Sequence, residues 1–111
     1  MTAEHEKARS VRHFFDEFEA HVDASRSAGK HVSYRFDVRG AGSWRIELDD
    51  GTVRVRESAP GEDADCVVQA DEKTFLGIVR QEKNPVLAYM TGKVKVQGGV
   101  SKLVELQEII R

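Results

Sequence analysis

The feature of the sequence that most constrains the fold is a set of three short runs between residues 32 and 56 in which every second residue is apolar. Successive side chains of a strand point to opposite faces, so this period predicts strands with one buried and one solvated face. The apolar residues are Val32, Tyr34, Phe36 and Val38, then Trp44, Ile46 and Leu48, then Val53 and Val55. Gly40 to Gly42 and Asp50-Gly51 separate the runs as turns, so the three strands are predicted to form a meander.

The segment before the meander has a helical pattern. From about Ala3 to Ala24, apolar residues recur at spacings of three or four, which places them on one face of a helix. The residues of this stripe are Val11, Phe14, Phe15, Phe18 and Val22. Charged residues fill the opposite side, so the apolar face of this helix is expected to be buried.

Downstream of the meander, residues 66–70 and 94–97 predict two further short strands. Asp71 and Asn84 are typical helix caps, and Pro85 suits the first position of a helix, so two helices are predicted after these caps, the second ending near Met90. A last helix follows the glycines at 98 and 99. Its inward residues are expected to be mainly Val100, Leu103, Val104, Leu106, Gln107 and Ile110.

This order of elements predicts an α+β fold in which helices cover one face of a sheet. A chain of 111 residues, 40% of them hydrophobic, can close one core but not two, so residues 1–111 are expected to form a single domain.

Composition excludes several classes of function. The formal net charge of −2 leaves no basic footprint, so we expect no nucleic-acid partner. No apolar run approaches the roughly 20 residues that span a bilayer, so membrane contact is expected to be transient at most. The polar first ten residues and the single cysteine predict a cytoplasmic protein.

The residues give no support for catalysis, a metal site or a cofactor. His5, His13 and His21 are eight residues apart and point in different directions around a helix, while His31 begins a strand. Cys66 lies in an apolar strand, where a buried and unreactive thiol is expected. We therefore predict no catalytic residue, no metal ligand and no cofactor.

The most specific segment runs from residue 64 to residue 98. It reads Ala-Asp-Cys-Val-Val-Gln-Ala-Asp, then Phe75, Lys83-Asn84-Pro85 and Ala88, then Gly-Lys-Val-Lys-Val-Gln-Gly. This order, together with the upstream Gly42-x-Trp44 and the leading amphipathic helix, resembles the sterol carrier protein type-2 family.

The resemblance implies a five-stranded mixed sheet with helices on one face and an apolar tunnel between them that accepts fatty acids, acyl chains or sterols. The implied partner is thus a lipid or another apolar small molecule, bound without chemistry. The residues expected around the tunnel are Tyr34, Phe36, Trp44, Ile46, Val53, Val55, Phe75, Ile78, Val79, Leu87, Met90, Leu103 and Leu106, with Gln107 as a polar partner for a head group. An alternative is an accessory module that docks an enzyme or forms a homodimer while its cavity is collapsed, and a third reading is an enzyme built on this scaffold.

The sequence departs from the family pattern in two places. Arg80-Gln81-Glu82 stands where members often have a glycine, which is expected to alter the turn between the two middle helices. The C-terminus lacks the peroxisomal tripeptide of many eukaryotic members, which suits a stand-alone cytoplasmic, prokaryotic version.

Overall fold

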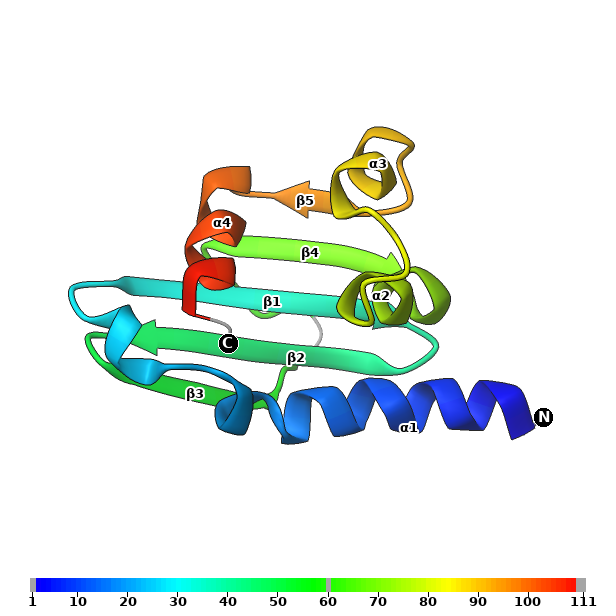
Figure 1. Cartoon of the computed structure of the whole chain (residues 1–111), viewed down its shortest axis with the longest axis horizontal. Coiled ribbons are helices and arrows are strands. Elements are labelled where there is room, and N and C mark those ends of the chain that lie inside the picture. The colour runs from blue at the N-terminus through cyan, green and yellow to red at the C-terminus, as the bar shows by residue number, and fades with distance from the viewer. Residues whose placement is uncertain (1, 60, 110–111) are drawn as a thin grey trace.

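The protein is built on a mixed five-stranded sheet. The computed structural model describes residues 2–59 and 61–109, without the side chains of residues 2–8, 104, 107 and 108. The strands are β1 (His31–Arg39), β2 (Gly42–Asp49), β3 (Thr52–Glu57), β4 (Cys66–Asp71) and β5 (Lys95–Gln97). Their order is β3-β2-β1-β4-β5, with β1 and β4 parallel and the other neighbours antiparallel (Figure 1). The predicted α+β fold is therefore confirmed.

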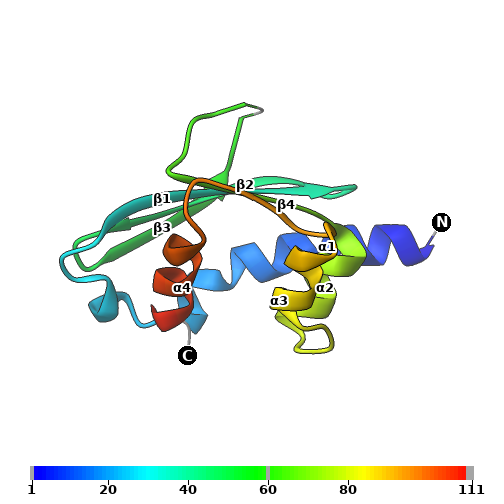
Figure 2. The ribbon, with the colours of Figure 1, turned by 90° about the horizontal axis from the view of Figure 1, so that it is seen from above.

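All described helices lie on one face of this sheet, as predicted. They are α1 (Thr2–Asp16), α2 (Glu72–Val79), α3 (Pro85–Met90) and α4 (Val100–Ile109), with two 3-10 turns, η1 (Phe18–His21) and η2 (Ala24–Ser27). Figure 2 shows the helices on one side and the loop between β3 and β4 on the other. The alternation of apolar and charged residues thus separates a core face from a wet face.

The N-terminal helix is shorter than the predicted span of residues 3–24. It ends at Asp16, and the chain continues through the two 3-10 turns. The Asp23 side chain accepts a hydrogen bond from the Ser25 backbone N–H at 3.1 Å, and the Asp23 N–H donates to the Ile109 carbonyl at 2.7 Å. These bonds start a new turn and tie it to α4, while Phe18 stays buried.

The predicted caps of α2 and α3 are confirmed. Asp71 accepts from the Thr74 N–H at 2.7 Å, and Asn84 accepts from the Val86 N–H at 2.8 Å, with Pro85 at the first position of α3. Each cap satisfies backbone donors that a helix start leaves without an intrahelical partner.

The turn after α2 contains the departure from the family pattern. Gln81 has a φ of 63°, in the left-handed region that favours glycine. Its N–H donates to the Ile78 carbonyl at 3.0 Å, and the Glu82 N–H donates to the Gly77 carbonyl at 2.7 Å. This is a Schellman motif, which normally has glycine at the position of Gln81.

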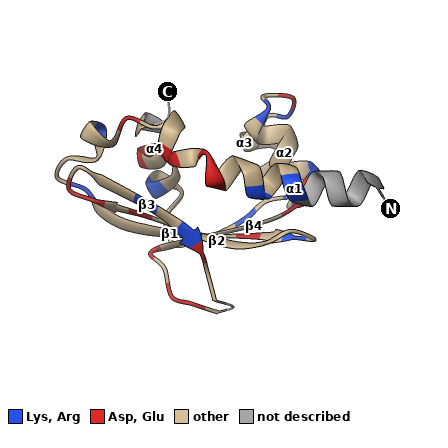
Figure 3. Ribbon diagram, turned by 90° about the horizontal axis from the view of Figure 1, so that it is seen from below, with Lys and Arg blue, Asp and Glu red and all other residues tan. Residues whose placement is uncertain are grey.

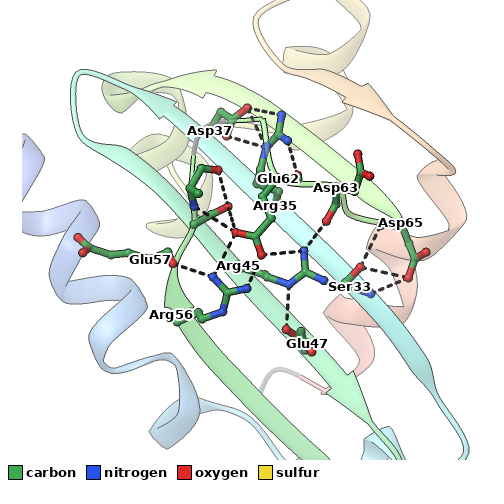
Figure 4. Close-up of polar contacts among 12 residues, drawn as sticks. Ser33, Arg35, Asp37, Arg45, Glu47, Arg56, Glu57, Glu62, Asp63 and Asp65 are labelled. Carbon is green, nitrogen blue, oxygen red and sulfur yellow. Dashed lines mark hydrogen bonds and ion pairs between the residues drawn. The ribbon is translucent and has the colours of Figure 1, made fainter.

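Three arginines lie side by side across the wet face of the sheet. In register, Arg35 faces Arg45, and Arg45 faces Arg56 (Figure 4). The Arg35 Nε is 3.0 Å from Asp37 Oδ1, and the Arg45 Nε is 2.8 Å from Glu47 Oε1. Carboxylates two residues away on the same strands therefore offset the repulsion between neighbouring guanidinium groups.

The loop between β3 and β4 is tied to this row of arginines. The carbonyls of Glu62 and Asp63 accept hydrogen bonds from Arg35 and Arg45, and the Glu62 carboxylate pairs with Arg56 (Figure 4). The hydrogen bond from Arg56 and one from the Ala59 N–H lower the pKa of Glu62 to about 2. Glu62 and Asp63 are thus held to the wet face by charge-assisted hydrogen bonds.

Candidate functional site

Four apolar side chains form a row across the core face of the sheet. Trp44 faces Phe36, Phe36 faces Val68, and Val68 faces Val96, so the row crosses β2, β1, β4 and β5. We call these four residues the apolar row. The row faces the helices, because the ring centroid of Phe36 lies 6.2 Å from that of Phe75 in α2.

The Trp44 end of the row is closed by aromatic packing. Phe15 of α1 stacks on Trp44 with 4.7 Å between ring centroids and an interplanar angle of 8°. Phe15 also stacks on Phe75 at 5.4 Å, and Phe14 packs edge-on against both phenylalanines. Geometries of this kind stabilise aromatic cores. Phe14 and Phe15, recognised in the sequence only as the stripe of a helix, therefore belong to the wall beside Trp44.

The Val96 end of the row is less completely covered. Trp44 and Val68 are buried, whereas Phe36 and Val96 are partly exposed. Ile78 of α2 and Leu103 of α4 pack against the core and are also partly exposed. Figure 1 shows α2 and α4 over opposite ends of β1 and β4. Each of these four side chains thus keeps part of its surface accessible, while Val68, which lies between Phe36 and Val96, is buried.

Tyr34 fastens α4 to the sheet. It faces Ile46 and Cys66 on the neighbouring strands, is fully buried, and donates its hydroxyl to the Lys102 carbonyl at 2.5 Å. Burial, and then the carboxylate of Glu105, raise the pKa of Tyr34. The phenol therefore stays protonated and serves as a hydrogen-bond donor to α4.

Cys66 is buried, as the sequence predicted. Its Sγ lies 3.9 Å from the Gly99 carbonyl, and burial raises the pKa of the thiol, although Lys102 opposes that shift. A thiol kept protonated in this way is a poor nucleophile.

The residues expected around a tunnel fall into three groups. Buried in the core are Tyr34, Trp44, Ile46, Val53, Phe75 and Leu106. Partly exposed and packed against the core are Phe36, Val55, Ile78, Val79 and Leu103. Leu87 and Met90 of α3 are exposed, and the side chain of Gln107 lies outside the described residues. In α4, Leu106 is buried and Leu103 is partly buried, as predicted, whereas Val100, expected inward, is exposed and Ile109 is buried in addition. The side chain of Val104 and the residue Ile110, also expected inward, lie outside the described residues.

Two grooves flank α1. The larger, of about 660 Å³, is lined by residues of α1, η1 and α2, and Val79 is its only contribution from the expected set. The smaller, of about 330 Å³, lies between α1 and the β2–β3 edge and includes Trp44 and Val55. Neither groove is lined by a residue of α4, so a tunnel between Trp44 and Leu103 stays a prediction.

The polar groups of the described part of the chain do not converge on a reaction centre. Among these residues, His13, His21 and His31 are all exposed, and no cluster of three or more His, Cys, Asp or Glu side chains is suited to holding a metal ion. Within the same residues, no helix has the length and apolar character needed to cross a bilayer.

Comparison with known proteins identifies a family and its relatives. The sequence model of the SCP-2 sterol transfer family matches residues 14–111. Hydroxysteroid dehydrogenase-like protein 2 of Xenopus laevis is 24% identical over 110 residues, which cover 97% of this chain and 26% of that protein. The chain thus spans about a quarter or less of the curated relatives it matches.

Solved structures share the fold. Sterol Carrier Protein 2 Like 2 from Aedes aegypti superposes with a TM-score of 0.70 at 16% identity, over 96% of this chain and 98% of that one. A stereoselective inverting sec-alkylsulfatase from Pseudomonas sp. superposes with a TM-score of 0.76 at 21% identity, over 87% of this chain but 16% of that one. The same fold therefore occurs both as a whole chain and as part of a much longer one.

Proposed function

The chain belongs to the SCP-2 sterol transfer family, and on this basis we propose that it is a single lipid-binding domain that holds a fatty acid, acyl chain or sterol-like molecule between its sheet and helices and transfers it without chemistry. The observation that carries the proposal is the family match over residues 14–111 combined with the partly exposed end of the apolar row. The compartment we infer for this role is the cytoplasm.

The ligand would lie on the accessible end of the apolar row. In this proposal Phe36, Val68 and Val96 would form the floor, with Ile78 and Leu103 on the two sides. The buried members of the expected set, including Tyr34 and Trp44, support that floor from within the core. A ligand that extends past Ile78 would approach α3, which carries Leu87 and Met90, and one that extends past Leu103 would follow α4, the helix that contains Gln107 (Figure 1).

Burial of an apolar chain provides enough free energy for this role. Each buried methylene contributes about 0.8 kcal/mol, so ten methylenes contribute on the order of 8 kcal/mol before ordering costs. A micromolar dissociation constant corresponds to about 8 kcal/mol net, so a chain longer than ten methylenes supplies the further burial that offsets the ordering costs, and no special polar motif is required. Non-directional burial also favours a broad range of lipids over one.

Among the side chains that the structure describes near this surface, none supports a reaction. The Cys66 thiol is buried and protonated, and the Tyr34 hydroxyl already donates to the backbone of α4. We therefore propose binding without catalysis by this chain.

Native mass spectrometry of gently purified protein, combined with displacement of a fluorescent fatty acid, tests the proposal. We expect co-purified lipid or saturable displacement at micromolar protein, and the absence of both would refute it. Val96→Trp should fill the accessible end of the row and weaken the fluorescent fatty acid at least tenfold. Lys95→Trp, one residue away on the opposite face of β5, is the matched control and should bind like the parent.

A second candidate function is an accessory module that docks an enzyme or a second copy of itself. Two observations favour it: Phe15 closes the Trp44 end of the row, and the fold forms 16% of the longer sulfatase chain. Light scattering and a pull-down distinguish the two functions. A stable complex together with an absence of fatty-acid binding would select the accessory module.

A further inference from the structure

The short helix α3 shows its apolar side chains to solvent. Val86 is 62% exposed, Leu87 59%, Tyr89 46% and Met90 73%, whereas Ala88 is the one buried residue of this helix. Contiguous apolar side chains on a protein surface mark an interaction site more often than scattered ones do. We call the four exposed residues the α3 patch.

This arrangement is fixed by local hydrogen bonds. Asn84 caps the start of α3, and the N–H groups of Lys93 and Val94 both donate to the Ala88 carbonyl, at 2.9 Å and 3.2 Å. The buried Ala88 and Val94 hold the segment to the core. The α3 patch is therefore presented outward by an ordered helix.

The segment of sequence that contains the α3 patch differs in charge from the rest of the chain. Between Lys73 and Lys102 the sequence has six lysines or arginines and a single acid, Glu82, whereas the whole chain has a formal net charge of −2. The residues outside this segment therefore carry a net negative charge. The helix α3 itself carries no charged side chain (Figure 3), so the cations lie beside the apolar residues rather than among them.

Three of these cations have no ion-pair partner within the described part of the protein, whereas the pKa of the Asp71 carboxyl is lowered by the hydrogen bond from the Thr74 N–H and, to a smaller extent, by nearby Lys83. Arg80, Lys93 and Lys95 are exposed, and none of them forms an ion pair with a described residue. Lys83 extends its methylenes over Gly77 and so follows the surface of α2. The α3 patch with Arg80, Lys93 and Lys95 beside it therefore complements a surface with an apolar interior and an anionic outer layer.

We infer that the α3 patch docks this protein on the surface of an anionic lipid membrane, with Val86, Leu87, Tyr89 and Met90 entering the interface and Lys93 and Lys95 contacting the lipid head groups. Aliphatic residues, a tyrosine and flanking lysines are the composition of interfacial contacts, because the lysines add attraction to anionic lipids. Figures 1 and 2 show α3 at a corner of the molecule beside the edge strand β5. A protruding tip suits a planar fluid surface, and the acidic remainder is repelled by that surface, which fixes the orientation.

Vesicle sedimentation of the full chain tests the inference, with vesicles of phosphatidylcholine alone and of equimolar phosphatidylcholine and phosphatidylserine. The parent should bind the mixed vesicles at least about tenfold more tightly, and salt should weaken that binding. Lys93→Glu with Lys95→Glu should reduce binding at least about tenfold, since each cation contributes about fivefold. Lys93→Glu alone should reduce binding about fivefold. Arg54→Glu, the same charge change as that single variant but on exposed β3, is its matched control and should leave vesicle binding close to that of the parent.

The apolar part is tested separately at Val86 and Tyr89. Val86→Ser with Tyr89→Ser should lose vesicle binding, whereas Val86→Leu with Tyr89→Phe should retain it. Thermal unfolding of each variant shows that the fold is unchanged. In Val86→Trp, bromine-labelled phosphatidylcholine should quench the new indole, while the buried Trp44 of the parent should stay unquenched.

The docking surface extends the proposed transfer function, and the two fail separately. Fatty-acid displacement in solution, without vesicles, should be the same for Lys93→Glu/Lys95→Glu as for the parent. Equal vesicle binding by parent and variants, or no binding to the mixed vesicles, would overturn the docking surface while leaving lipid binding intact. A protein complex that depends on the α3 patch, in the absence of vesicle binding, would also overturn it.

Discussion

The hydrogen bond between Tyr34 and the Lys102 carbonyl gives the sharpest test of how α4 is held. Tyr34 is fully buried, and its hydroxyl lies 2.5 Å from that carbonyl, 68 residues away in the chain. Tyr34→Phe removes the donor but keeps the ring that packs between Ile46 and Cys66. The substitution therefore isolates the polar link between the sheet and α4.

The expected loss follows from the cost of a buried hydrogen bond. A typical intramolecular hydrogen bond contributes about 0.5–1.5 kcal/mol, and a buried group left without its partner costs about 1–3 kcal/mol. We therefore expect Tyr34→Phe to lower the free energy of unfolding by about 1–2 kcal/mol at neutral pH. Urea unfolding measures this change. Tyr89→Phe is the matched control: its side chain is exposed and has no hydrogen-bond partner among the described residues, so its effect should stay within about 0.5 kcal/mol.

The pH dependence gives a second, independent readout. Burial and Glu105 raise the pKa of Tyr34 in the folded state above its ordinary value of 10.0. Above pH 10 the unfolded chain releases this proton while the folded chain keeps it, so the parent loses stability as pH rises. Phenylalanine has no such proton. The stability difference between parent and Tyr34→Phe should therefore shrink about one pH unit above the ordinary tyrosine pKa.

Hydrogen exchange locates the effect. In Tyr34→Phe, the amides of α4 should exchange faster than those of β1 and β2, because the lost bond tethers only that helix. A Tyr34→Phe variant as stable as Tyr89→Phe at neutral pH, or a difference that stays constant into the alkaline range, would refute this account of the α4 anchor.

Three further predictions concern the backbone and the wet face. Gln81→Gly should raise the free energy of unfolding by about 0.5–1 kcal/mol. Glycine relieves the left-handed strain of about 1–2 kcal/mol, and the larger entropy of the unfolded chain cancels part of that gain. An unchanged urea midpoint would contradict this prediction. Gly98→Ala should lower the free energy of unfolding by at least about 2 kcal/mol, since its φ is 101° and a Cβ there would lie 2.2 Å from the Asp65 carbonyl oxygen; a stable variant in thermal unfolding would show that this contact relaxes. Glu62→Gln should be less stable than the parent at neutral pH, because pairing with Arg56 holds the Glu62 pKa at about 2. That stabilisation is present above the unfolded-state pKa and is lost as pH falls toward 2, so the two proteins should converge in acid unfolding, and a constant gap would rule the pairing out as its cause.

The sequence predicted the turns, helix caps and buried strand faces, because neighbouring residues determine these features. Asp50-Gly51 indicated a hairpin, and both residues have positive φ, as a type I′ turn requires. Asp71 and Asn84 cap the helices that follow them, because their side chains reach backbone donors two or three residues away. The alternation of Tyr34 and its neighbours determined which face of β1 is buried.

Contacts between distant segments determined what the sequence did not predict. The parallel pairing of Phe36 with Val68 joins strands separated by two others in the chain, and alternation alone does not select such a neighbour. The turn that follows α1 is tied by the hydrogen bond from the Asp23 N–H to the Ile109 carbonyl, almost at the other end of the chain. Helical periodicity also identified the apolar residues of α3 without indicating that Ala88 alone faces the core.

The two ends of the apolar row differ, and this difference determines from which end a ligand would enter the proposed site. Phe15 and Trp44 close one end by stacking at 4.7 Å, so an apolar chain cannot enter there without breaking the aromatic core. The other end finishes at Val96 on β5, an edge strand. Lys95, the neighbour of Val96, belongs to the cations that we place against the membrane. If both proposals hold, the same edge of the sheet receives the lipid and contacts the bilayer, so the acyl chain passes from one apolar phase to the other over the length of a few side chains. The cost of exposing that chain to water, about 0.8 kcal/mol for each methylene, is then largely avoided, which is the physical advantage of docking at the open end of the row.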